Sequence, residues 1–394
     1  MSKTYKILTV TPFFPPDIGG ISSHVWNLDA NLIREENNVS IIAPKHFGNK
    51  IKESNEIFNQ IYRISSIYLP GWPYPTLRSV SVPIDLGIKI KSVIRNGNFD
   101  IIHVHGHHYP TSWMAINSAH RYGVTSVLTL HGMYALNPNV LGGKSRIEDW
   151  FNKYAFTRIL SKTNGVIGLT DYITNYAKQF GKEHTKYFTI PNGVITELFR
   201  KNLNNKVEYR KKYGINQNST IILFCGRFEH VKGIIDFVEA AKKIVKKSGV
   251  EIVIVGGGSL GSQVKSIIGN SEHIHLFDWQ PQEQIHELYI ASDVFVLPSR
   301  FEALPLTIIE AMNAGLHIVF TQVGGIPEVL EGYSSKTILS NVSPEEIENV
   351  VLKVISNFRD PYNMNELLDY AQRFDWNYVT SNTVKVYAEC INKK

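Results

Sequence analysis

Short apolar runs alternate with longer amphipathic stretches along almost the whole chain, and the alternation occurs as two successive series. Apolar strands separated by helices predict parallel sheets that are covered by helices on both faces. Two series predict an α/β protein with two doubly wound domains, in which ligands bind beyond the carboxyl ends of the strands. The first series has predicted strands at 5–11, 39–43, 101–105, 126–130 and 165–169, with helical patterns at 22–34 and 112–122. The second has predicted strands at 219–225, 251–255, 273–277, 293–297 and 317–320, with helices that begin near Lys232, Leu260, Gln282 and Leu306.

The chain length of 394 residues suits two domains better than one core. The most favourable boundary is the stretch 191–214, which contains Pro-Asn-Gly and then a polar run, 202–206, with little capacity to bury surface. We therefore predict a first domain over 1–195 and a second domain over 196–375. The remaining segment, 376–394, carries a helical pattern.

The composition is that of a globular protein, with 43% hydrophobic and 19% charged residues. No apolar run approaches the roughly 20 residues that span a bilayer. Prolines that closely follow the first apolar run argue against a signal peptide. The two cysteines, Cys225 and Cys390, cannot form a disulfide framework or a cysteine-rich zinc site. These features predict a cytoplasmic protein.

The net charge of +6 is unevenly distributed. Residues 1–190 hold 20 Lys and Arg against 12 Asp and Glu, whereas residues 251–350 hold 3 against 13. A nucleic-acid-binding protein is not expected to have this pattern, so nucleic acid is excluded as a partner. The basic first half fits an anionic acceptor or a membrane surface, and an ordinary solvated face explains it as well.

Two glycine-containing turns follow corresponding strands of the two series. In the first, Gly19 and Gly20 come directly before a predicted helix, where backbone amides can approach an anion. In the second, Arg227 and Lys232 lie in a turn that leads from strand 219–225 into a helix, where both cations could converge on a diphosphate. Neither turn is the G-x-G-x-x-G dinucleotide fingerprint, which argues against a nicotinamide cofactor. The alternative for the first turn is a purely structural role. The alternative for the second turn is a loop with two exposed cations that bind no ligand.

The most specific motif contains two carboxylates eight residues apart, Glu302 in a predicted loop and Glu310 in the helix that follows. A carboxylate can accept hydrogen bonds from two vicinal hydroxyl groups. One carboxylate for a ribose and one for a hexose is a chemically reasonable division.

Together these motifs resemble glycosyltransferase family four, which has the GT-B fold and retains anomeric configuration. The resemblance covers residues from about 5 to 390 and depends on the joint order of motifs that are individually weak. These motifs are Gly19-Gly20, Thr129-Leu130-His131-Gly132, Pro191-Asn192-Gly193-Val194, Gly226-Arg227, Lys232-Gly233, Val255-Gly256-Gly257-Gly258, Glu302-x7-Glu310, Gly324-Gly325-Ile326-Pro327-Glu328 and Trp376. The glycines at 256–258 are a departure, because many relatives carry an acidic residue between glycines there.

The resemblance implies two Rossmann-like domains that face a cleft, with the final helix crossing back to the first domain. It implies that Arg227 and Lys232 hold the diphosphate, that Glu310 binds the ribose, and that His131 is the active-site histidine beside the donor sugar. It further implies donor contacts from Gly20, Glu302, Ala303, Leu304 and Pro305.

Four histidines lie within residues 103–108. Three interpretations remain open: zinc binding by His103 and His105 on one strand face, lining of an acceptor cleft by His105 or His107, and packing. No cysteine or acidic group nearby completes a zinc site, and the chain has no Asp-x-Asp motif. We therefore expect no metal and no cofactor, only a nucleoside-diphosphate sugar as co-substrate.

The sequence thus predicts a retaining, metal-independent glycosyltransferase. It moves a hexosyl or N-acetylhexosaminyl group from a UDP- or GDP-sugar to a glycan, lipid-linked or small-molecule acceptor. The alternatives are a GT-B sugar-nucleotide epimerase and an inactive nucleotide-sugar-binding subunit. A Pro-rich aromatic loop at 68–75, with Arg78, Lys89, Lys91 and Arg95 nearby, suggests peripheral docking at the inner face of a membrane. A soluble acceptor, with these aromatic rings packed on the first domain, is the alternative.

Overall fold

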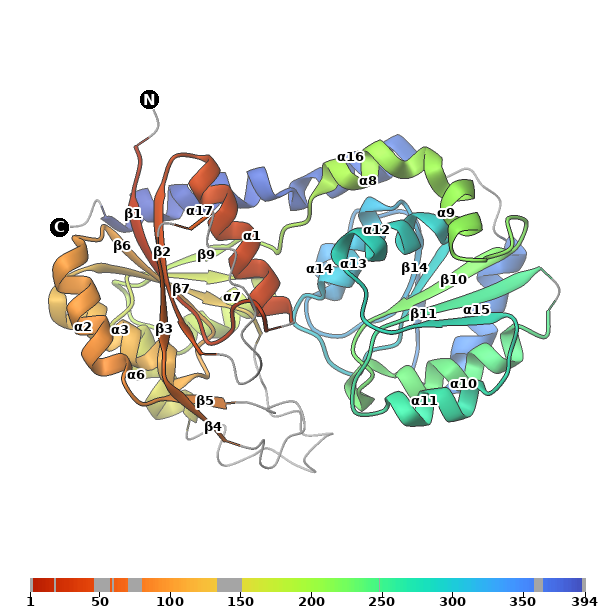
Figure 1. Cartoon of the computed structure of the whole chain (residues 1–394), viewed down its shortest axis with the longest axis horizontal. Coiled ribbons are helices and arrows are strands. Elements are labelled where there is room, and N and C mark those ends of the chain that lie inside the picture. Colours follow the sequence, from red (N-terminus) through yellow and green to blue (C-terminus); the bar gives the residue numbers. More distant parts are fainter. Residues whose placement is uncertain are drawn as a thin grey trace. The chain divides into compact units, whose positions relative to one another are not determined.

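The computed structural model describes residues 3–17, 19–45, 57–58, 60–69, 80–132, 151–247, 249–357 and 364–391. The chain divides into two compact units, one formed by residues 1–193 with 376–394 and the other by residues 194–375. Each unit is a parallel sheet with helices packed against it (Figure 1). Among the described residues, no helix combines the length and the apolar character that crossing a bilayer requires.

The first unit has a sheet with the strand order β3-β2-β1-β6-β7-β8-β9. Its strands are β1 (Lys6–Val10), β2 (Asn38–Pro44), β3 (Gln60–Ile64), β6 (Ile101–His105), β7 (Thr125–Leu130), β8 (Gly165–Gly168) and β9 (Lys186–Thr189). A separate antiparallel pair is formed by β4 (Ser66–Leu69) and β5 (Val80–Pro83). The helices are α1 (Gly20–Arg34), α2 (Leu86–Gly97), α3 (Pro110–Tyr122), the π-helical turn Phe151–Phe156, α6 (Thr157–Leu160), α7 (Asp171–Lys178) and α17 (Trp376–Ile391). The last of these comes from the end of the chain and packs beside α1 and β7 (Figure 1).

The second unit has a sheet with the strand order β12-β11-β10-β13-β14-β15. Its strands are β10 (Thr220–Cys225), β11 (Val250–Val255), β12 (Ile274–Phe277), β13 (Val294–Leu297), β14 (His317–Thr321) and β15 (Lys336–Leu339). Its helices are α8 (Thr196–Asn202), α9 (Lys206–Lys212), α10 (Ile234–Ile244), α11 (Gly261–Ile268), α12 (Gln282–Ala291), α13 (Leu306–Asn313), α14 (Ile326–Val329), α15 (Pro344–Asn357) and α16 (Met364–Ala371).

Both sheets reverse their winding at one point, between β1 and β6 in the first unit and between β10 and β13 in the second. The central strands are buried along their whole length, as the apolar runs in the sequence predicted. Ligands of doubly wound sheets bind outside the carboxyl ends of the strands at such a reversal. The two reversals therefore mark where each unit is able to hold a ligand.

The polar run 202–206 itself contains no buried residue, and it belongs to the second unit. It lies between α8 and α9, whose Phe199 and Tyr209 side chains are buried. The buried Arg210 guanidinium forms a 2.6 Å ion pair with Asp293 at the start of β13. Each of these two helices therefore packs on the second unit through a few buried side chains.

Candidate active site

Two loops of the second unit meet at its winding reversal. One loop, 226–233, follows β10, and the other, 298–305, follows β13, the strand next to β10. The backbone amide of Arg300 donates a 2.8 Å hydrogen bond to the carbonyl of Val231 and joins the two loops. Two motifs that lie far apart in the sequence are thereby brought together.

Lys232 and Glu302 form an ion pair across these two loops. Their side chains are only 15% and 9% exposed, so water screens the pair less than it would screen a surface pair. The hydroxyl of Ser299 donates a further hydrogen bond of 2.8 Å to the same Glu302 carboxylate oxygen. Since an ammonium group has three donors, Lys232 still has hydrogen atoms for an anionic ligand.

Two glycines allow the backbone to approach this pair closely. Gly324 has a φ of +56°, and a Cβ there would lie 1.6 Å from the carbonyl oxygen of Glu302. Gly233 has a φ of +66°, and a Cβ there would lie 2.1 Å from the carbonyl oxygen of Pro298. The Lys232-Gly233 and Gly324-Gly325 motifs therefore have a structural role, which is to fix the shape of the loop that carries Glu302.

Glu310 lies in α13, in the helix that begins directly after Pro305. Burial raises the pKa of its carboxyl to about 7, although a hydrogen bond with Tyr289 acts in the opposite direction. Between the two carboxylates, Leu304 and Pro305 are buried and Ala303 is partly exposed. The site thus has one carboxylate paired with a cation and one whose ionisation falls near neutral pH.

The other predicted residues of the second unit lie in the same loops. Arg227 is exposed, and its guanidinium forms no hydrogen bond or ion pair within the part of the chain that the structure describes. The glycine run 256–258 packs against the Arg227 loop, because the Phe228 amide donates a 2.9 Å hydrogen bond to the Gly257 carbonyl. The departure from the family pattern at 256–258 therefore lies beside the predicted diphosphate contact.

In the first unit, Gly20 begins α1 close to the carboxyl end of β1. A Cβ at this position would meet no atom of the described residues within 4 Å, in contrast to Gly233 and Gly324. The fold of this unit does not require a glycine there.

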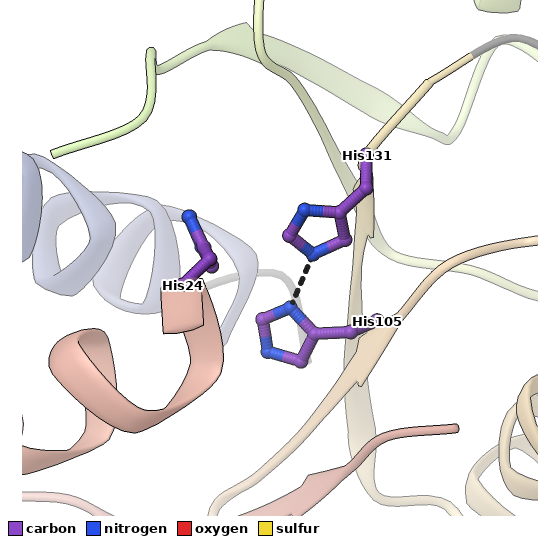
Figure 2. A group of neighbouring side chains, drawn as sticks. All are labelled: His24, His105 and His131. Atoms are coloured by element: carbon purple, nitrogen blue, oxygen red, sulfur yellow. Dashed lines mark hydrogen bonds between the residues drawn. The ribbon is translucent and has the colours of Figure 1, made fainter. Parts of the chain in front are cut away.

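His131 follows β7 and is one of three histidine rings that converge at the sheet (Figure 2). Its Nε2 atom lies 3.0 Å from Nδ1 of His105, at the end of β6, and its ring centroid is 4.7 Å from that of His24 in α1. The Nδ1 atom of His24 lies 2.9 Å from Oδ1 of Asn192. One ring nitrogen from each histidine lies within 4.8 Å of the others, so these three residues are the described histidines that could hold a metal.

His24 and Asn192 were not predicted as site residues. His24 lies one helical turn after Gly20, and Asn192 belongs to the Pro-Asn-Gly motif. Gly193 of the same motif approaches the ring of Trp376 so closely that a Cβ would lie 2.5 Å from it. The His24 ring also contacts Trp376, with centroids 5.4 Å apart. Helical spacing from the glycine turn was the only signal in the sequence that could have pointed to His24.

His103 and His107 can now be compared with the three interpretations that the sequence left open, which are zinc binding, lining of an acceptor cleft, and packing. Both ring nitrogens of His103 are used, because they lie 2.7 Å from Tyr387 Oη and Thr129 Oγ1, so the structure does not favour the interpretation in which His103 and His105 bind zinc. His107 is buried against Phe156, with ring centroids 4.6 Å apart, which is a packing role.

Comparison with protein families identifies the chain. Residues 18–198 match the model described as Glycosyltransferase Family 4, and residues 205–370 match the model described as Glycosyl transferases group 1. The chain belongs to glycosyltransferase family four. This family-four chain is a glycosyltransferase with an α/β GT-B fold, as the resemblance predicted.

Three similar proteins show how far the likeness extends. An uncharacterized glycosyltransferase from Methanocaldococcus jannaschii is 24% identical over 97% of each chain. The GPI3 subunit of phosphatidylinositol N-acetylglucosaminyltransferase from Saccharomyces cerevisiae is 25% identical over 97% of this chain and 82% of its own. The structure of Anabaena HepE in complex with UDP-glucose has a TM-score of 0.70 with 17% identity, over 99% of this chain and all of that one. The family-four chain is thus similar to these proteins along nearly its full length.

Proposed function

We propose that this glycosyltransferase takes a hexosyl or N-acetylhexosaminyl group from a nucleoside-diphosphate sugar and transfers it with retention of configuration, without a metal ion. The observation that carries the proposal is the buried Lys232–Glu302 pair, at the carboxyl ends of the central strands in the same unit as Glu310. A cation and two carboxylates match the diphosphate and the two sets of hydroxyl groups of such a donor.

The leaving nucleoside diphosphate gains negative charge in the transition state. Fixed cations that are already in place stabilise this charge without reorganising. Glu302 and the loop contacts hold the Lys232 ammonium in position before any donor arrives. Arg227 is exposed and free to add a planar, bidentate contact. These two side chains would do the work for which other transferases use a metal held by an Asp-x-Asp motif, which this chain lacks.

The donor is assigned to the second unit. Glu310 accepts hydrogen bonds from the ribose hydroxyl groups, and Glu302, with the backbone of Ala303, Leu304 and Pro305, contacts the donor sugar. A uridine donor is favoured over a guanosine donor, and the UDP-glucose complex of HepE supports this choice.

The first unit contributes Gly20 and His131. Since the fold leaves open space where a side chain at Gly20 would lie, we assign that space to a phosphate or to the acceptor. His131 is assigned to the donor sugar.

The acceptor is proposed to be lipid-linked or otherwise anionic, at a membrane surface. The name of the yeast relative, a phosphatidylinositol N-acetylglucosaminyltransferase, supports a lipid acceptor. The predicted aromatic residues around Trp72 and the cation Arg78 lie outside the described residues. Close by in the sequence, the apolar side chains of Ile84 and Ile88 are 65% and 79% exposed, at and before the start of α2, which carries the basic residues.

Those basic residues are not equivalent. Lys89 is paired with Asp85 at 2.7 Å, and the Arg95 guanidinium stacks over the ring of Tyr122. Lys91 is exposed to solvent. Docking is therefore proposed to depend on the exposed isoleucines together with charge, and less on the simple number of cations.

The experiment that tests the proposal uses the purified chain with UDP-, GDP- and ADP-sugars. Saturation-transfer NMR identifies the donor, and proton NMR of the product with a lipid-linked acceptor gives the anomeric configuration. We expect a uridine donor and a retained configuration. An inverted product would contradict retention, conversion of the donor without acceptor would indicate an epimerase, and donor binding without turnover would indicate an inactive binding subunit.

A further inference from the structure

The His105–His131 contact arises from the register of two neighbouring strands. His105 pairs with Thr129 in the parallel ladder of β6 and β7, and His131 follows two residues later. The two rings are 5.2 Å apart between centroids and inclined by 31°, with Nδ1 of His105 facing Nε2 of His131 (Figure 2). Backbone pairing therefore places the two rings beside each other, and in the structure the facing nitrogens are Nδ1 of His105 and Nε2 of His131.

The surroundings also hold His105 in place. Its side chain is fully buried, and its ring lies against His103, with centroids 4.2 Å apart. His103 in turn is hydrogen-bonded to Tyr387 of α17 and to Thr129. The His105 ring is thus packed between His103 and His131, and His103 is held by Tyr387 and Thr129.

Burial favours the neutral form of each imidazole ring in the cluster by lowering its pKa. Burial lowers the pKa of His105, with smaller contributions from His103, His131 and His24, to well below its usual value. Burial likewise holds the pKa of His131 well below its usual value. A neutral imidazole has one N–H donor and one acceptor nitrogen, so only one of the two facing nitrogens carries the shared hydrogen.

The buried environment of His105 decides which nitrogen carries it. Its Nε2 atom is buried and has no hydrogen-bond partner among the residues that the structure describes. A buried N–H without an acceptor is less favourable than an unpaired acceptor atom. His105 therefore carries its hydrogen on Nδ1 and donates it to Nε2 of His131.

We propose that His105 is a positioning residue that holds His131 in the Nδ1–H tautomer, so that His131 offers a hydrogen-bond donor to the substrate. The proposal rests on the proposed function, in which His131 contacts the donor sugar. With its hydrogen on Nδ1, His131 can donate a hydrogen bond from this atom to a hydroxyl oxygen or to a developing negative charge. In the opposite tautomer, the Nδ1 atom could only accept a hydrogen bond. His131 then acts by donating a hydrogen bond and does not act as a base.

The same geometry argues against the cluster as a metal site. A histidine that binds a metal almost always donates its other N–H to a carbonyl, a carboxylate or water. His24 has such a partner in Asn192. His105 would have to move its hydrogen to Nε2, which has no hydrogen-bond partner in the described part of the chain.

The tautomer can be measured directly, without substrate. Nitrogen-15 NMR of histidine-labelled wild-type protein distinguishes Nδ1–H from Nε2–H, and His131→Asn identifies the signals of His131 by their loss. We expect the Nδ1–H pattern for His131. An Nε2–H pattern, or stoichiometric zinc in the purified protein by elemental analysis, would overturn the proposal whether or not the chain transfers sugar.

Variants at position 105 test the consequence. The amide nitrogen of Asn can take the place of the imidazole Nδ1, so His105→Asn should keep kcat within a few-fold of wild type. His105→Ala removes the donor and should lower kcat by about 10- to 100-fold with little change in the KM for donor, since positioning errors have effects of this order. The exposed His120 on α3 provides the control, and His120→Ala should leave both kcat and the His131 signals unchanged. Equal losses in His105→Asn and His105→Ala would mean that His105 serves only for packing.

Discussion

The Lys232 ammonium and the Glu302 carboxylate form an ion pair in the second unit, although they are 70 residues apart in the sequence. They meet because β10 and β13 are neighbours at the winding reversal, and each residue lies in the loop after one of these strands. Because the two side chains hold each other, a substitution of one residue should also change the contribution of the other to donor binding.

A double-mutant cycle tests this linkage. Glu302→Gln should weaken the sugar-dependent part of donor binding and should also release Lys232, so that nucleoside diphosphate binding falls as well. A charged hydrogen bond contributes about 1.5 to 3 kcal/mol, which calorimetry can measure. The coupling free energy between Glu302→Gln and Lys232→Ala, measured for donor binding, should be of this order. Additive effects of the two changes would show that the pair plays no part in donor binding.

Glu310 should make donor binding depend on pH near neutrality. Its pKa is raised to about 7, and the ribose hydroxyl groups are expected to prefer the ionised carboxylate. Nucleoside diphosphate affinity should therefore rise as pH rises through about 7, and binding below that pH should release a proton. Calorimetry in two buffers with different ionisation enthalpies measures this release. Glu310→Gln should weaken binding and remove the proton release; unchanged affinity in this variant would contradict the ribose role.

The same shift has a consequence for stability. An unfolded carboxyl titrates near its usual value of 4.5, so between about pH 4.5 and 7 the folded protein keeps a proton that the unfolded chain has lost. This contribution is fully present below pH 4.5 and is lost as pH rises through 7. Thermal melting across this range should show a smaller pH dependence for Glu310→Gln than for wild type.

The glycines at 20 and 324 should respond differently to alanine. Gly20→Ala places a methyl group in open space at the start of α1, so the melting temperature should stay the same or rise slightly. Activity should fall if a ligand uses that space. Gly324→Ala combines a positive φ with a severe contact and should destabilise the protein by roughly 1 to 3 kcal/mol or more. Full activity of Gly20→Ala would contradict the proposal that a phosphate or the acceptor occupies the space beside Gly20.

Membrane docking can be tested on residues whose exposure is known. Ile84→Glu and Ile88→Glu should reduce co-sedimentation with vesicles of phosphatidylcholine and phosphatidylglycerol, and binding should fall with salt because charge contributes. Trp72→Ala should have the same effect. Ile338→Glu, at an exposed isoleucine of β15, is the matched control. Absence of binding to anionic vesicles at low ionic strength would contradict docking.

The central strands of the two parallel sheets could be predicted from the sequence, whereas three of their four edge strands could not, β12 being the exception. Strands such as β6 and β11 are buried on both faces and appear as apolar runs. The edge strands β3, β9 and β15 are partly exposed and carry polar residues, so they have no apolar run to identify them. Their pairing depends on the neighbouring strand, which a local pattern does not contain.

The residues of the candidate site likewise divide into those that the sequence could place and those that it could not. Glu302 and Glu310 could be placed in a loop and the following helix because both lie in one short motif. The Lys232–Glu302 pair and the contact of His105 with His131 depend on strand order and register. His24 reaches the same cluster from α1, and no spacing in the sequence links it to residues 105 and 131.

Transfer kinetics in the presence of EDTA test the central claim most directly, which is that Arg227 and Lys232 stabilise the leaving diphosphate without a metal. The wild-type rate should be unchanged by EDTA, and Arg227→Ala and Lys232→Ala should each lower kcat/KM by roughly 10²- to 10³-fold, as loss of one such group typically does. Lys232→Arg should also be poor, because a planar fork does not replace a compact charge. Near-wild-type kcat/KM in both alanine variants with the fold intact, or loss of wild-type activity in EDTA, would contradict the claim.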